Sequence, residues 1–336
     1  MIVLGIESTC DETGASIVEN GVRILSNVVA SSADIHERFG GVFPELACRR
    51  HIDAIIPVIE EAMAKANVTP DDVDLIAVAK GPGLVGALLI GMNAAKGLSI
   101  AWKKPFIGIN HVEAHLYAAM MDPSFKNPFP ALGVVLSGGH TLLLKINDIG
   151  SYEPIGTTVD DAIGEAFDKV ATLLGLPYPG GPHIERLSRE GNPKAFSFSA
   201  GRVKKNPLCF SFSGLKTNVL YAVKGQNGQG KTEIVNRADV AASFQETALR
   251  DVVLKASLAI KNFECRSIVF GGGVCNNQRL RDLFSETLPE MDLFWPPLNL
   301  SQDNAAMIAG LGFQKMIRNP KGDLLDLEVQ TRIPIA

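Results

Sequence analysis

Cysteine is scarce in this sequence, and its spacing excludes two common kinds of small-domain framework. The five cysteines stand at positions 10, 48, 209, 265 and 275, and no two of them have C-x-x-C spacing. A zinc ribbon and a disulfide framework are therefore both disfavoured. Unpaired cysteines are typical of a reducing compartment, so we expect a cytoplasmic protein.

Long hydrophobic runs and an excess of positive charge are also missing. The longest apolar stretch, Leu84 to Ala95, contains two glycines, stops at Lys96 and is shorter than the roughly 18 residues that a membrane span needs. The start, MIVLGIESTC, lacks the basic lead of a signal peptide. We therefore expect no association with a membrane. Net charge is -4, so contact with nucleic acid would need a local basic patch or a partner protein.

What the sequence contains is the pattern of an α/β protein in two halves. The length of 336 residues fits two domains, and 46% apolar with 20% charged residues is typical of a globular chain. Strand, polar turn and strand are expected within residues 2–30 and again within 131–157. Further helices are expected at 44–65, from about 84, and at 160–174, 237–262 and 302–317, and further strands at 74–79, 106–109, 267–270 and 292–296.

The expected boundary lies in DPSFKNPFP (122–130), because prolines and polar residues are typical of a connection. We therefore predict an N-terminal half of residues 1–125 and a C-terminal half of residues 126–336. Within the second half, residues 186–237 are rich in Lys, Arg, Gly and Ser and have no regular apolar pattern. They predict a basic insertion or mobile lobe.

Two of the six histidines, His111 and His115, stand four residues apart in INHVEAHLY. On a helix this spacing puts both imidazoles on one face, where they could bind one divalent ion. They could equally be two histidines on an exposed polar face with no metal. The protease motif H-E-x-x-H does not fit, because Glu113 follows two positions after His111 and points roughly 200° around the helix.

A metal site of this kind needs a third ligand, usually a carboxylate. Asp303 in SQDNAAM is a candidate because it lies where a loop meets a helix. The alternative is that Asp303, or Ser301 before it, is only the N-cap of that helix.

Three turns of small residues each follow an apolar strand: STCDETG (8–14), LSGGHT (136–141) and GGGVCNN (271–277). Glycine lets the backbone approach an anion, and exposed N–H groups can bind phosphate. Together the turns favour a nucleotide or phosphoester in a cleft between the halves, with 136–141 and 271–277 on opposite sides of it. None of the turns matches a P-loop or G-x-G-x-x-G.

Carboxylates near these turns are open to more than one interpretation. Asp11 and Glu12 could hold a metal-bound water, accept a proton or cap their turn. Asp168 could bind a ribose hydroxyl, or it could pair with Lys169 or a nearby arginine.

Taken together, nine segments resemble one family, the tRNA threonylcarbamoyladenosine biosynthesis protein TsaD, formerly called O-sialoglycoprotein endopeptidase. They occur in the family's order between about residues 2 and 312: GIESTCDETG, GGVFPELACRRH, GPGLVGALLIG, NHVEAH, LSGGHT, GEAFDKVATLLGLPYPGGP, FSFSGLKT, GGGVCNN and QDNAAMIA. The resemblance implies the two-lobed α/β fold shared by actin, Hsp70 and sugar kinases (ASKHA).

The resemblance also implies an enzyme, an acyltransferase. It would transfer threonylcarbamoyl from threonylcarbamoyl-AMP to the exocyclic amine of adenine 37, next to the anticodon, in tRNAs that read codons beginning with A. One divalent metal ion per subunit is implied, usually Fe²⁺ with Zn²⁺ as another occupant, bound by His111, His115 and Asp303.

The implied substrate-binding residues form two groups. At one of these positions the family often has Asp, where this chain has Glu185. The adenylate would lie across Val135, Leu136, Ser137, Gly138 and Gly139, with Asp168, Gly181, Glu185 and Asn277 around its adenosine part. Asp11 and Glu12 are the implied candidates for positioning the amine or accepting its proton.

Partners are implied as well: tRNA, a metal-free paralogue of the same fold (TsaB-like) and a P-loop ATPase (TsaE-like). Three other classes of function are weighed against the transferase. A small-molecule kinase of this fold would not need the histidine pair, and a metalloprotease would need a differently placed glutamate. The third of these classes is a non-catalytic scaffold.

Overall fold

The computed structural model describes residues 1–32, 43–122, 125–126, 128–225 and 236–333. The chain forms two compact units. Unit 1 comprises Met1–Asn127, Asp148–Tyr152 and Pro296–Ala336, and unit 2 comprises Pro128–Asn147 and Glu153–Trp295. Each unit is built around a five-stranded mixed sheet.

The sheet of unit 1 has the order β3-β2-β1-β4-β5. Its strands are β1 (Ile2–Glu7), β2 (Glu12–Glu19), β3 (Arg23–Ser31), β4 (Leu75–Gly81) and β5 (Phe106–Asn110). Strand β2 is antiparallel to its neighbours β1 and β3, whereas β1, β4 and β5 are parallel. Parallel strands end at the same edge, so the residues that follow β1, β4 and β5 gather there.

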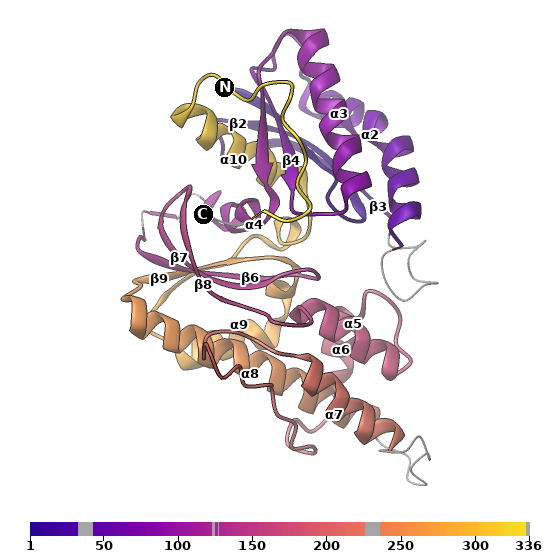
Figure 1. The fold of residues 1–336 in the computed structure, drawn as a ribbon, viewed down its shortest axis with the longest axis vertical. Coiled ribbons are helices and arrows are strands. Elements are labelled where there is room, and N and C mark those ends of the chain that lie inside the picture. Colours follow the sequence, from indigo (N-terminus) through magenta and orange to yellow (C-terminus); the bar gives the residue numbers. More distant parts are fainter. Residues whose placement is uncertain (33–42, 123–124, 127, 226–235, 334–336) are drawn as a thin grey trace. The chain divides into compact units, whose positions relative to one another are not determined.

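Helices cover both faces of this sheet because successive strand residues point to opposite sides. Leu4 and Ile6 of β1 belong to a buried apolar cluster with residues of α2 (Pro44–Ala66) and α3 (Val85–Trp102). The intervening Gly5 lies against the backbone of α10 (Ala305–Arg318), so that a side chain there would collide with the Ala305 carbonyl. Figure 1 shows α2 and α3 on one face and α10 on the other.

The C-terminal segment corrects the predicted division of the chain. We expected residues 126–336 to form one half, but 296–336 belong to unit 1. Helix α10 is buried along most of its length against β1, β2 and β4, so its apolar residues complete the core of unit 1. Helix α4 (His111–Met120) packs against α10 within the same unit.

Unit 2 repeats the strand order of unit 1. Its sheet runs β8-β7-β6-β9-β10, with β6 (Ala131–Leu136) central, β7 (Thr141–Asp148) antiparallel to it and β9 (Ser267–Gly271) parallel to it. The outer strands are β8 (Ser151–Thr157) and β10 (Asp292–Phe294). The prediction of two α/β halves that each begin with strand, turn and strand is confirmed.

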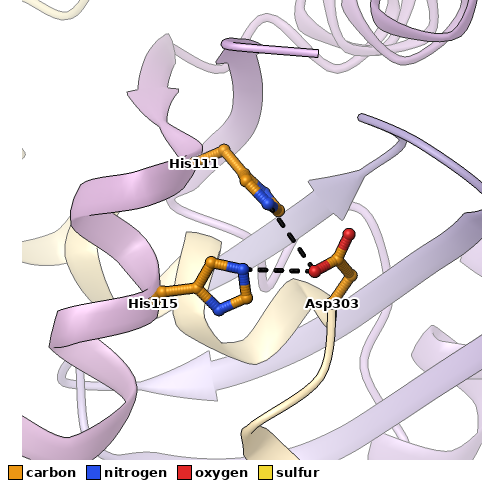
Figure 2. A group of neighbouring side chains, drawn as sticks. All are labelled: His111, His115 and Asp303. Carbon is orange, nitrogen blue, oxygen red and sulfur yellow. Dashed lines mark ion pairs between the residues drawn. The ribbon is translucent and has the colours of Figure 1, made fainter. Parts of the chain in front are cut away.

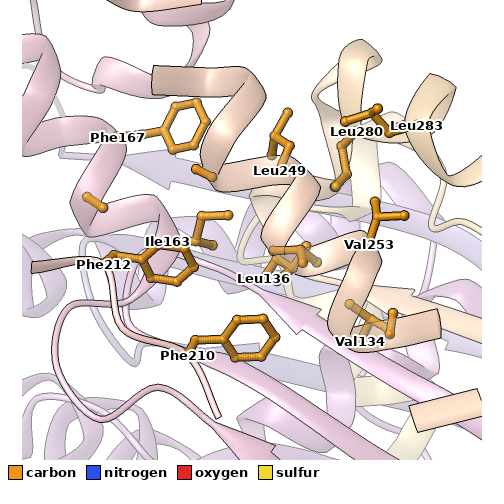
Figure 3. Close-up of a cluster of buried hydrophobic side chains, with 14 of the residues drawn as sticks. Val134, Leu136, Ile163, Phe167, Phe210, Phe212, Leu249, Val253, Leu280 and Leu283 are labelled. Carbon is orange, nitrogen blue, oxygen red and sulfur yellow. The ribbon is translucent and has the colours of Figure 1, made fainter. Parts of the chain in front are cut away.

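The helices of unit 2 surround one large apolar cluster, part of which Figure 3 shows. They are α5 (Ile163–Leu173), α6 (Gly180–Ser188), α7 (Ser213–Lys224), α8 (Arg237–Phe263) and α9 (Gln278–Thr287), and a short 3-10 turn lies at Gly273–Asn276. A second 3-10 turn, Leu298–Leu300, belongs to unit 1.

The predicted lobe at 186–237 is largely an integral part of unit 2. Phe210, Phe212, Leu215 and Val219 are fully buried in the cluster. The sequence did not predict helix α7, because only two of its residues, Leu215 and Val219, are buried, which leaves a weak helical pattern. Residues 226–235 of this stretch lie outside the described residues.

Among the described helices, only α3 is long and apolar enough to cross a membrane by length and composition. Its face with Ala87, Leu88, Gly91, Met92 and Ala95 is buried, and it packs on β4 and α2 as a core helix does.

Candidate functional site

Helix α4 carries both histidines of the predicted metal pair. It begins directly after β5, and Asn110 caps it, since the Asn110 Oδ1 accepts from the backbone N–H groups of Val112 and Glu113. We considered an exposed histidine face, and the structure contradicts this: all ten residues of α4 are buried, with His111 5% and His115 0% exposed. The helix is sandwiched in unit 1, so its polar groups need partners.

Asp303 lies next to the two imidazoles, as Figure 2 shows. Its Oδ1 is 3.2 Å from the Nε2 of His115 and 3.6 Å from the Nε2 of His111. One ligand atom from each of the three residues lies within 4.8 Å of the others. Two ligand atoms of one ion, with bonds of about 2.0–2.2 Å, lie at most about 4.4 Å apart, so this spacing is close to that of a metal-ligand set.

Asp303 is not the N-cap of α10, which was the alternative left open by the sequence. Asn304 is the cap, because its Oδ1 accepts from the N–H of Met307. The Ser301 hydroxyl donates to the Pro297 carbonyl instead. Capping therefore does not explain the position of Asp303, and its carboxylate faces the histidines.

The donor set fits a divalent cation, and His115 provides the test. Within the described ranges, neither ring nitrogen of His115 has a hydrogen-bond partner, because its approach to Asp303 lacks hydrogen-bond geometry. A fully buried imidazole without partners is costly. A cation bound between two imidazoles and a carboxylate would give the Nε2 of His115, the nitrogen that faces Asp303, its partner.

Glu7, the last residue of β1, is a buried carboxylate that sequence reasoning did not single out. Its Oε2 is 3.0 Å from the Nδ1 of His111, and its Oε1 accepts from the N–H of Thr9 at 2.7 Å. Burial lowers the pKa of His111, but Glu7 and Asp303 outweigh it and raise that pKa to about 9. Carboxylates on both edges of this ring favour positive charge, as a cation site requires.

Glu113 takes no part in this cluster. Its Oε2 lies 2.7 Å from the Nζ of Lys315 on α10. The carboxylate of a metalloprotease base must reach the metal-bound water, whereas this one is engaged in an ion pair. The protease interpretation is therefore not supported by the contacts of Glu113.

Asp11 lies in the turn between β1 and β2, and Glu12 begins β2, close enough to Asp303 to interact electrostatically. Burial raises the pKa of Glu12 well above its usual value, and the negative charges of Asp11 and Asp303 raise it further. Buried His51 of α2 supports this turn: its Nδ1 is 2.8 Å from the Thr13 hydroxyl and its Nε2 is 3.0 Å from the Cys10 carbonyl. A carboxyl group with a raised pKa is suited to proton transfer near neutral pH.

Two of the three small-residue turns meet in unit 2. Strands β6 and β9 are parallel neighbours, so Leu136 and Gly271 end at the same edge of the sheet. Gly272 has a φ of +96°, and a side chain there would collide with the Leu136 carbonyl. We expected the turns at 136–141 and 271–277 on opposite sides of a cleft, and the structure instead places them side by side.

The turn after β6 keeps its glycines open. The N–H of Ser137 donates to the His140 carbonyl, and the N–H of His140 donates to the Ser137 hydroxyl. Among the described residues, no atom lies within 4 Å of a Cβ built on Gly138 or Gly139. Helix α5 begins beside this turn, because the N–H of Gly164 donates to the Ser137 carbonyl. An open glycine turn at a strand end next to a helix N-terminus is typical of phosphate sites.

Asp168, Gly181 and Glu185 also lie together in unit 2. The Oδ1 of Asp168 accepts from the N–H of Gly180, the first residue of α6, at 2.7 Å. The Lys169 Nζ contacts Asp161 and Glu165. A Cβ built on Gly181 meets nothing within 4 Å in the described part of the chain.

Glu185 and Asn277 meet at the start of α9. The Oε1 of Glu185 accepts from the N–H of Gln278, the residue that follows Asn277. The Asn277 side chain caps α9 through the N–H of Leu280 and donates to the Gln245 Oε1. Both polar atoms of its side chain therefore have partners within the protein, which the sequence did not indicate.

Fold and site together define a class. The chain has two α/β units with the same strand order, and strands in both units are followed by small-residue turns. This is the architecture of actin, Hsp70 and sugar kinases. Solved structures agree: the chain aligns with full-length HypF at a TM-score of 0.63 and 14% identity, covering 96% of this chain and 47% of that one. It aligns with the ROK hexokinase of Thermus thermophilus at a TM-score of 0.51 and 16% identity, covering 96% and 100%. The predicted ASKHA fold is confirmed.

Sequence comparison identifies the family within this class. Residues 23–310 match the family described as "TsaD: tRNA N6-adenosine threonylcarbamoyltransferase". A protein of that name from Protochlamydia amoebophila is 59% identical over 338 residues, covering 100% of this chain and 98% of the relative. The chain belongs to the TsaD family. It is a transferase that acts in tRNA modification, as the resemblance predicted.

Proposed function

We propose that the protein transfers a threonylcarbamoyl group from threonylcarbamoyl-AMP to N6 of adenine 37, in tRNAs that read codons beginning with A. The amine nitrogen attacks the carbamoyl carbonyl, a new C–N bond forms, the C–O bond to phosphate breaks and AMP leaves. The observation that carries the proposal is the His111, His115 and Asp303 cluster in a chain of this family. A kinase would have no use for that cluster.

His111, His115 and Asp303 would hold one divalent ion. Two imidazoles and a carboxylate suit Fe²⁺, the ion we propose first, and also Zn²⁺. When bound, the ion would polarise the carbonyl and neutralise charge on the threonyl end of the donor. The protein supplies a buried, low-dielectric setting in which this effect is strong.

The end of β6 and the turn after it, from Val135 to Gly139, would bind the phosphate of the adenylate. Its open glycines leave room for close backbone approach, and N–H groups aimed at the leaving phosphate would stabilise the charge that develops on it. Around the adenosine part we propose Asp168, Gly181, Glu185 and Asn277. Because the Asn277 amide caps α9, its proposed contribution is to hold the α9 N-terminus in place.

Asp11 and Glu12 are our candidates for the proton transfer. The acceptor amine loses a proton as it attacks, and a nearby carboxylate must take it or position the amine. Glu12, with its raised pKa, is the better match for a group that accepts a proton at neutral pH.

We propose tRNA contact at the exposed basic residues Arg202, Lys204 and Lys205 of unit 2. The partners proposed are a metal-free paralogue of the same fold (TsaB-like) and a P-loop ATPase (TsaE-like), in the cytoplasm. Helices α2 and α3 pack side by side and expose large apolar side chains that suit a protein partner. These are Ile52 and Ile56 on α2, and Val85, Leu89 and Ile100 on α3.

The deciding experiment is reconstitution. The purified protein, its partners and unmodified tRNA are incubated with threonine, bicarbonate and ATP, and the digested tRNA is examined by mass spectrometry for the threonylcarbamoyl nucleoside. The same reaction with the His111→Ala/His115→Ala variant is the control. Product with the parent alone supports the proposal, whereas equal product from both contradicts the role of the histidines.

A further inference from the structure

Glu7 contacts the proposed metal centre from the side opposite to Asp303. Its carboxylate is 0% exposed and lies 3.0 Å from the Nδ1 of His111. The other ring nitrogen, Nε2, is the one that lies 3.6 Å from the Asp303 Oδ1. The two edges of one imidazole therefore face two different carboxylates.

We infer that Glu7 is a positioning residue for the metal centre: it accepts a hydrogen bond from the Nδ1–H of His111 and so presents Nε2 to the cation. This inference rests on the proposed metal site. In metal centres, a carboxylate on the far nitrogen fixes the tautomer and ring orientation of the ligating histidine and raises its basicity. The sequence places Glu7 far from His111, so only the fold reveals the contact.

The requirement is for a carboxylate rather than any polar side chain. Two donors converge on Glu7, the N–H of Thr9 at 2.7 Å and the ring of His111 at 3.0 Å. Glutamate has an acceptor oxygen for each of them. Glutamine has only one carbonyl oxygen, so its NH₂ group would have to face one of the two donors.

The backbone around Glu7 is suited to this task. Glu7 ends β1, which lies between β2 and β4 in the sheet. The next residues are held as well, because the Thr9 carbonyl accepts from the N–H of Leu84 at 2.8 Å. A carboxylate on a rigid strand end restricts the orientations open to the His111 ring, which is what a preorganised metal site needs.

The experiment measures Zn²⁺ binding by calorimetry in the parent, Glu7→Gln and Glu113→Gln. Glu113 is the matched control, since it is also a buried carboxylate, two residues from His111, but it pairs with Lys315. We expect Glu7→Gln to weaken Zn²⁺ binding about 10- to 100-fold, the usual cost of losing such a partner. Glu113→Gln should keep an affinity close to that of the parent.

Unchanged Zn²⁺ affinity in Glu7→Gln, or an equal loss in both variants, would overturn the inference. If the parent itself takes up no Zn²⁺, the metal part of the proposed function fails, and the role of Glu7 fails with it.

A second measurement needs no variant and covers the case in which Glu7→Gln does not fold. Nitrogen-15 NMR of the Zn²⁺-loaded parent, with labelled histidine, reports which ring nitrogen of His111 carries the proton. A proton on Nδ1 supports the inference, and a proton on Nε2 contradicts it.

Discussion

Gly138→Val should weaken the binding of AMP without disturbing the fold. No atom of the described residues lies within 4 Å of a Cβ built at this position, and its φ is not positive. Substitutions in open space usually change stability by no more than about 0.5 kcal/mol. Gly272 is the contrasting position, because its φ of +96° and the adjoining Leu136 carbonyl make any side chain strained, at a cost of about 1–3 kcal/mol.

The expected loss of affinity follows from the hydrogen bonds at stake. A backbone N–H that donates to a charged phosphate contributes about 1.5–3 kcal/mol. Valine methyl groups at Gly138 would displace the phosphate from at least one such donor. At about 1.4 kcal/mol per tenfold change, AMP should bind about 10- to 100-fold more weakly.

Calorimetric titration with AMP, beside thermal unfolding, separates the two positions. Gly138→Val should unfold at the temperature of the parent and bind AMP weakly, whereas Gly272→Val should unfold at a lower temperature. A folded Gly138→Val with the parent's AMP affinity would refute the reasoning, since the turn would then be only a connection between β6 and β7.

Three further predictions concern the metal, tRNA and stability. His111→Ala with His115→Ala should remove stoichiometric Zn²⁺ and also lower the unfolding temperature, because both side chains are buried; metal analysis and thermal scans measure this, and a double variant that retains the metal contradicts the assignment. Replacing the basic residues Arg202, Lys204 and Lys205 by Ala should weaken tRNA binding and reduce the slope of log affinity against log salt by roughly 0.7–0.9 for each phosphate that the variant no longer neutralises. Ala at the exposed Lys65 and Lys103 should leave both affinity and slope unchanged, and a slope equal to the parent's in the triple variant places the tRNA elsewhere. Asp160→Asn should destabilise the protein by about 0.5–2 kcal/mol, since Asp160 accepts from the N–H groups of Phe212 and Ser213 at the start of α7. Burial raises the pKa of Asp160, but these bonds and those from the Ser211 and Ser213 hydroxyls outweigh it and lower that pKa in the folded protein. The stabilisation is therefore present above the pKa of the unfolded chain, about 3.9, and is lost as pH falls through the lower pKa of the folded protein. Urea titrations at pH 7 and in acid should show that the difference in stability between variant and parent shrinks in acid.

The sequence by itself determined the local elements and the family. Short apolar runs bounded by polar turns placed the strands of both sheets, and helical spacing placed α2, α8 and α10 to within a few residues, because both patterns depend on near neighbours in the chain. It missed α7, which buries only Leu215 and Val219. The nine motifs identified the family because each keeps its residues at short, fixed spacings.

Tertiary structure decided what those elements do for one another. Only the return of α10 to unit 1 brings Asp303 to the histidines, and only packing on all sides makes α4 a buried helix rather than a surface one. The pairing of β6 with β9 set two glycine turns side by side. Glu7 became visible as the partner of His111 for the same reason: contacts between residues far apart in the chain depend on how strands and helices pack, and no local spacing encodes them.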